Sequence, residues 1–123
     1  EKYGLKTMHT YSDSNLSRHL PKYLSKVIAH REKLKIFTKL IAPESSKHDV
    51  APHSQHYTTN EWREVRFMPD KFTFTGTMIM GGSMAVCFSL KDNQVHTIVL
   101  ESESVVQMFI QFFSYTWDSL KKS

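Results

Sequence analysis

Two turn signals divide residues 76–101 into three short apolar segments, and this pattern constrains the fold more than any other feature of the sequence. The dipeptide Gly81-Gly82 allows the positive φ angles that a tight hairpin needs. The polar stretch 91–94 forms the second break. The intervening segments are rich in Val, Ile, Met and Phe, which favours hairpin-linked strands.

The last two of these segments, residues 84–90 and 95–101, are almost continuously apolar. A strand without a polar face is typically covered on both sides. We therefore expect helices to pack on both faces of these strands, or a second layer to cover them in a dimer.

Other strands and helices are expected in the rest of the chain. Apolar residues recur at helical spacing over residues 16–31 and 105–120, and Ser102 or Ser104 should cap the second helix. Residues 44–60 are polar and predict a long loop with room for one short helix. Further strands are expected at 5–11, 35–42 and 61–69. The predicted fold class is α/β, a mixed β-sheet with flanking helices in the order β-α-β-loop-β-β-β-β-α.

Length and composition fit one domain over residues 1–123, with 40% hydrophobic residues and a net charge of +4. That charge falls short of the dense basic surface of nucleic-acid binders. No apolar run of 18 residues or more occurs, so no membrane association is expected. The single cysteine, Cys87, lies in an apolar run, which indicates a buried inert thiol and a reducing, cytoplasmic location.

The seven histidines do not form a recognisable metal site. His48, His53 and His56 fall in the polar loop without a C-x-x-C or H-E-x-x-H partner motif, so neither a metal nor a cofactor is expected. His96 is interpreted as a structural histidine of a strand.

No nucleophile motif occurs, and we expect the chain not to be an enzyme. A small enzyme using the His-rich loop is a third alternative, behind the two functions considered below.

A candidate ligand site lies where two expected strands end. Ser12, Asp13 and Ser14 follow the first strand, and Glu44 and Ser45 follow the second. If these strands are parallel neighbours joined by a crossover helix, their carboxyl ends lie side by side. Hydroxyls and carboxylates suit a polyol or sugar.

Each part of this site also has a structural interpretation. The serines and aspartate could simply cap a helix. Arg66 could face the same ligand, or it could pair with Glu64 or Asp70.

Three phrases resemble the C-terminal domains of TrmB-like transcription regulators. They are LPKYLSKVIAHREKLKIFTKLIAP, WREVRFMPDKFTFTGTMIMGGSMAVCFSL and TIVLESESVVQMFIQFFSYTWDSLKK. The resemblance implies a phospholipase-D-like α/β fold that follows an N-terminal, DNA-binding winged helix, and in several members senses sugars or other small molecules. The phospholipase D signature H-x-K-x4-D is absent, because none of the seven histidines is followed two places later by Lys. The resemblance therefore implies the fold without that catalysis.

Two functions are consistent with these features. The first is the effector-binding and dimerisation domain of a TrmB-like regulator, which would reach DNA only through a winged helix that these 123 residues do not include. The alternative is a ligand-free oligomerisation module. In both, the chain is expected to form a homodimer through its C-terminal helix. Met108 and Phe112 widen the apolar stripe of this helix beyond that of a simple surface helix.

Overall fold

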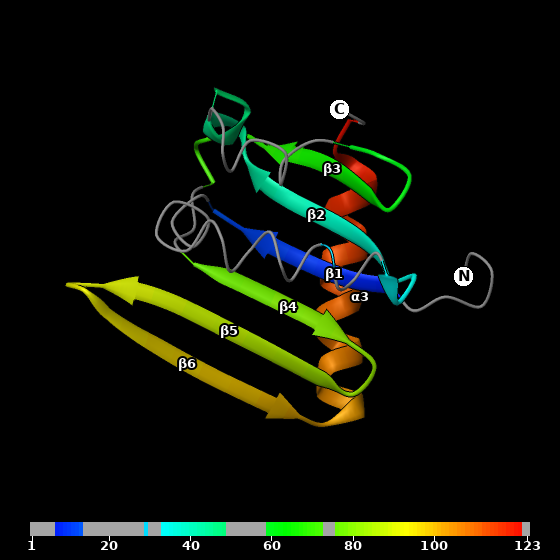
Figure 1. The fold of residues 1–123 in the computed structure, drawn as a ribbon, viewed down its shortest axis with the longest axis vertical. Helices are drawn as coiled ribbons and strands as arrows, with labels where there is room; N and C mark the ends of the chain where they lie inside the picture. The colour runs from blue at the N-terminus through cyan, green and yellow to red at the C-terminus, as the bar shows by residue number, and fades with distance from the viewer. Residues whose placement is uncertain (1–6, 14–28, 30–32, 49–58, 73–75, 122–123) are drawn as a thin grey trace.

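The computed structural model describes residues 7–13, 29, 33–48, 59–72 and 76–121. They form one mixed sheet of six strands in the order β3-β2-β1-β4-β5-β6 (Figure 1). The strands are β1 (Thr7–Ser12), β2 (Phe37–Pro43), β3 (Arg63–Met68), β4 (Thr77–Gly81), β5 (Met84–Lys91) and β6 (Gln94–Glu101). The α/β class and all six strands are confirmed. The helix expected over residues 16–31 lies almost entirely outside the described residues.

The sheet has a parallel half and an antiparallel half. Strands β1, β2 and β3 run parallel, whereas β4, β5 and β6 follow one another as antiparallel neighbours and β4 pairs antiparallel with β1. Both expected turns are present. Gly82 has a φ of 59° in the first, and Asp92 and Asn93 have φ of 53° and 62° in the second. Two consecutive positive φ angles characterise the type I′ hairpin turn, which matches strand twist.

One long helix, α3 (Glu103–Ser119), crosses a single face of the sheet (Figure 1). Ser102 caps it by accepting a hydrogen bond from the Val105 N–H at 3.4 Å. Its buried residues are Val106, Ile110, Phe113 and Trp117, and they pack against Ile41, Met80 and Ala85 of the sheet. This is the main core. A smaller cluster of Leu40, Ala42 and Val65 lies on the opposite face.

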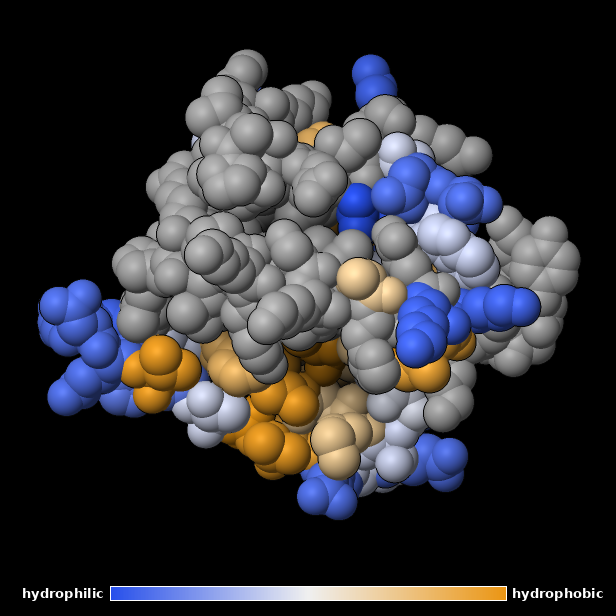
Figure 2. All heavy atoms as spheres, in the orientation of Figure 1, coloured by the Kyte–Doolittle hydropathy of each residue, from blue (hydrophilic) through white to orange (hydrophobic). Residues whose placement is uncertain are grey.

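Strand β6 corrects one expectation from the sequence. Its residues Val95, Ile98 and Val99 are 64%, 61% and 53% exposed, so neither face of this strand is covered within the described residues. The reason is topological, because β6 is an edge strand and α3 crosses the sheet near only one end of it. Figure 2 shows apolar atoms gathered over the part of the near face where Figure 1 places β5 and β6. Coverage of this surface by a second molecule stays a prediction.

One short helix follows β2. The expected short helix in the polar loop is the 3₁₀-helix η2 (Glu44–His48). No helix in the described ranges is long and apolar enough to cross a membrane.

Candidate functional site

The carboxyl ends of β1 and β2 lie side by side, as the ligand-site hypothesis requires. The two strands are parallel neighbours in which Tyr11 pairs with Ile41. At this edge the side chains of Ser12 and Asp13 are buried. Their polar atoms are therefore held inside the protein, and their partners decide what they can do.

Both residues bond to the start of β4. The Asp13 carboxylate accepts the Gly76 N–H at 2.8 Å, while the Asp13 N–H donates to the Gly76 carbonyl at 3.0 Å. The Ser12 hydroxyl donates to the Asp13 carbonyl at 2.9 Å and lies 3.1 Å from the Thr77 hydroxyl. This pair consequently joins β1 to the start of β4 across 63 and 65 residues of the chain, and the polar atoms named here bond within the protein.

No local pattern in the sequence marks Gly76 as the partner of Asp13. Its φ is +118°, and a Cβ at this position would lie 2.2 Å from the Phe88 carbonyl oxygen. Only glycine combines that backbone conformation with such a close approach.

The remaining strand-end residues are less enclosed. Glu44 and Ser45 are exposed at the start of η2, where the Ser45 N–H donates to the Asp70 carboxylate at 3.1 Å. Ser14 lies outside the described residues. Polyol binding at this edge stays a prediction, and the structure places Ser12 and Asp13 in intramolecular bonds there.

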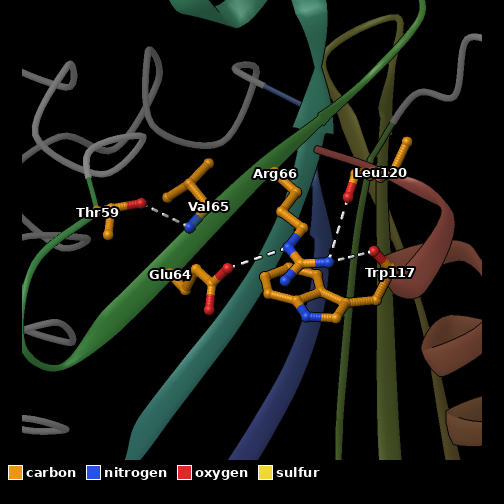
Figure 3. A network of polar contacts seen from close by, with 6 residues as sticks. All are labelled: Thr59, Glu64, Val65, Arg66, Trp117 and Leu120. Atoms are coloured by element: carbon orange, nitrogen blue, oxygen red, sulfur yellow. Dashed lines mark hydrogen bonds and ion pairs between the residues drawn. The ribbon is translucent and has the colours of Figure 1, made fainter. Parts of the chain in front are cut away.

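Arg66 does not join the strand-end site. It lies on the α3 side of β3, pairs with Glu64 at 3.0 Å and stacks on the Trp117 ring (Figure 3). Its guanidinium donates to the carbonyls of Trp117 and Leu120 at 2.6 and 3.2 Å. A cation at the carboxyl end of a helix satisfies free carbonyls and complements the helix dipole. The predicted pairing with Glu64 is confirmed, and the contact with α3 gives Arg66 a structural task.

A hollow of about 400 Å³ lies elsewhere, on the α3 side of β4, β5 and β6. Side chains from four strands line it, because Cys87 pairs with Met78 and Ile98, and Ser89 pairs with His96. This site was not predicted from the sequence. The two-residue turn at Asp92-Asn93 sets the register that brings these side chains together, and that turn was the available signal. The described lining residues are Tyr11, Gly76, Thr77, Met78, Cys87, Phe88, Ser89, His96 and Ile98.

Two expectations change at the hollow. Cys87 is only half-buried, although burial does raise the pKa of its thiol. His96 was interpreted as structural, yet it is exposed at the rim. No group of three or more His, Cys, Asp or Glu residues that could hold a metal ion occurs in the part of the chain that the structure describes.

A half-buried histidine, His9, lies next to the main core. The His9 ring meets Phe113 edge-on, with centroids 5.1 Å apart, and its Nδ1 is buried without a hydrogen-bond partner. Burial lowers the pKa of His9, and the nearby Lys39 charge lowers it further, while a backbone hydrogen bond with Met80 acts in the opposite direction. Burial and the Lys39 charge therefore both favour the neutral form of His9.

No sequence-family model and no curated protein matches this chain. Solved structures with a similar fold include the following two. Nuc, a phospholipase D family member from Salmonella typhimurium, aligns over 98% of this chain and 84% of its own, with 13% identity and a TM-score of 0.69. TrmBL2, described as an archaeal chromatin protein with a novel mode of DNA binding, aligns over 95% of this chain with 16% identity and a TM-score of 0.62.

These similarities are informative about the fold. The chain spans 46% of the length of TrmBL2. The resemblance to TrmB-like domains inferred from the sequence is confirmed at the level of structure. The chain has a phospholipase-D-like fold, which it shares with TrmBL2 and with Nuc.

Proposed function

We propose that this chain is a regulatory domain of a TrmB-like transcription regulator, which self-associates through α3 and responds to a small molecule. The fold shared with TrmBL2 supports this assignment. So does the sequence, which lacks the H-x-K pair of phospholipase D at all seven histidines. In this role the domain performs no catalysis, and contact with DNA belongs to a winged helix outside these residues.

The observation that carries the proposal is a second apolar stripe on α3. The first stripe, with spacing 4-3-4, is buried against the sheet. The second runs with spacing 3-4-3 along the outside of the helix, where Met108, Phe112 and Tyr115 are 56%, 62% and 82% exposed. Its members are Val105, Met108, Phe112 and Tyr115.

Spacing of 3-4-3 is the pattern by which one helix packs along another. A helix that needs only to cover a sheet requires one stripe, so the outer stripe has no task in the single chain. A second copy of α3 supplies a matching stripe, because a two-fold interface places the same residues on both sides. We call this stripe the α3 seam.

Sedimentation velocity across micromolar concentrations tests self-association. The wild-type chain should form a dimer, and Phe112→Glu should weaken it at least tenfold, because a carboxylate would be buried in the seam without a partner. Gln111→Glu is the matched control, since it adds the same charge one residue away, on an exposed position outside the seam. A wild-type chain that sediments only as a species near 14.4 kDa would rule out the dimer.

The alternative function, a ligand-free oligomerisation module, has its own support. Ser12, Asp13 and Arg66 bond within the protein, so three of the residues expected to hold a ligand are engaged in the fold. A thermal-shift screen with sugars, nucleotides and small aromatic molecules separates the two functions. A ligand that binds only the folded state raises the melting temperature, and no shift with any class would favour the ligand-free module.

A further inference from the structure

The hollow between α3 and the β5–β6 hairpin exists because the helix stops covering the sheet partway along these strands. α3 packs on Met80 and Ala85, whereas Cys87 and Ser89 point to the same side of β5, two and four positions further on. Figure 1 shows the β5–β6 hairpin extending well past the helix. Cys87 and Ser89 therefore lie beyond the part of the sheet that α3 covers, and both are only half-buried.

The chemistry of the lining is specific. Met78 and Ile98 provide carbon surface on this side of the sheet, and no Lys, Arg, Asp or Glu is among the described lining residues. The polar side-chain atoms on this side of the sheet are the hydroxyls of Tyr11 and Ser89, the imidazole of His96 and the thiol of Cys87. An apolar pocket with a few convergent polar groups is the usual form of a small-molecule site, and about 400 Å³ lies within the usual size range.

We propose that this hollow binds a small, uncharged, planar apolar molecule that carries one or two hydrogen-bonding groups. A flat ring system can lie against the carbon surface of Met78 and Ile98. Its polar group then meets the Ser89 or Tyr11 hydroxyl. Sugars fit the hollow poorly, because most of their hydroxyls would lose water without gaining a partner. Phosphates fit poorly too, because no Lys or Arg is among the lining residues that the structure describes.

The hollow also lies beside the α3 seam. Tyr11, at its edge, makes a hydrogen bond with Thr116 of α3 and packs edge-on against Phe113. The Thr116 hydroxyl bonds the Phe112 carbonyl one turn earlier, so Phe112 projects from the same side of the helix. A bound molecule would thus lie next to a residue of the seam. In the proposed regulatory domain, the ligand would therefore be a small apolar molecule, and its contacts beside Tyr11 would link ligand binding to self-association through the α3 seam. In that respect the inference rests on the proposed function.

Cys87 makes the proposal directly measurable, because it is the only cysteine in the chain and it lines the hollow. We would follow its reaction with DTNB at pH 8.5, with 2-naphthol as the probe. Only the unoccupied protein exposes the thiol, so the probe at ten times its Kd should slow the reaction about tenfold. Ile98→Glu, which places a carboxylate in the hollow, should remove this protection, and so should Ile98→Trp, which fills it.

The matched control is Val99→Glu, because Val99 is similarly exposed but lies on the opposite face of β6. It should retain the protection. The inference is overturned if 2-naphthol gives no protection, if Val99→Glu also removes it, or if myo-inositol protects where 2-naphthol does not. The rate of Cys87 labelling should not depend on protein concentration when no probe is present. A slower rate at higher protein concentration would show that a second copy fills the hollow, which also contradicts the proposal. Sedimentation of the same samples reports on self-association separately, so a dimer without protection removes the ligand site and leaves the proposed dimer intact.

Discussion

The guanidinium of Arg66 stacks on the indole of Trp117, with its Cζ 4.4 Å from the ring centroid, and donates to the carbonyl of the same residue at 2.6 Å. One side chain thus joins the edge strand β3 to the last turn of α3. The helix that carries the proposed seam is anchored at this end by Arg66, and at the other end by its cap.

Replacing Arg66 with Ala should destabilise the fold by roughly 2–3 kcal/mol, because the change removes the stacking, two hydrogen bonds to the helix end and the partner of Glu64. Arg66→Lys should restore only part of the loss, since an ammonium cannot stack and fork in the same way. Urea unfolding measures both, with Lys71→Ala as an exposed control. Equal stability of the Lys variant and the wild type would contradict this account of the contact.

Glycine should matter far more at position 76 than at position 82. Both have positive φ, but a Cβ at Gly76 would meet the Phe88 carbonyl, whereas a Cβ at Gly82 would meet nothing within 4 Å. Gly82→Ala should cost only about 1 kcal/mol. Gly76→Ala should cost at least twice that, because the backbone must also move. Thermal melts of the two variants compare them, and similar melting temperatures would show that the close approach at Gly76 has no energetic consequence.

Stability should fall as the pH drops below about 6.5, the ordinary histidine pKa, and His9 should account for part of the fall. The folded state lowers the pKa of His9, so it binds fewer protons there than the unfolded chain does. Acid therefore favours unfolding. His9→Phe keeps the aromatic contact with Phe113 and removes the titrating group.

Urea unfolding of both proteins at pH 7.5 and pH 5.5 isolates the contribution of His9. The difference in unfolding free energy between the two pH values should be smaller in His9→Phe than in the wild type. The same pH dependence in both proteins would place the acid sensitivity at other histidines.

The sequence was sufficient for the strands and for both hairpin turns, because those depend on local patterns. Gly81-Gly82 and Asp92-Asn93 mark turns through their own backbone preferences, and the apolar runs on either side of them become strands. The burial of β6 could not be predicted in the same way. An apolar run looks alike in a central and an edge strand, and only the strand order decides which neighbours it has.

The candidate site shows the same limit. The pairing of Arg66 with Glu64 was accessible, because two residues separate them in a strand. The contact of Arg66 with Trp117 spans 51 residues and depends on where α3 ends. The bond between Asp13 and Gly76 spans 63 residues, and nothing local to either residue marks it. The hollow, in contrast, could have been found by extending the hairpin register from the turn.

We propose that this domain brings two copies of a regulator together through the α3 seam, and a fusion to a monomeric helix-turn-helix domain tests this most directly. Two linked DNA-binding domains should bind an operator with two half-sites about a hundredfold more tightly than the unfused domain does, because the second contact becomes intramolecular. The Gln111→Glu fusion should bind as tightly as the wild-type fusion, and the Phe112→Glu fusion should bind as weakly as the unfused domain. Equal operator affinity for the wild-type and Phe112→Glu fusions would contradict the claim that the α3 seam holds the dimer.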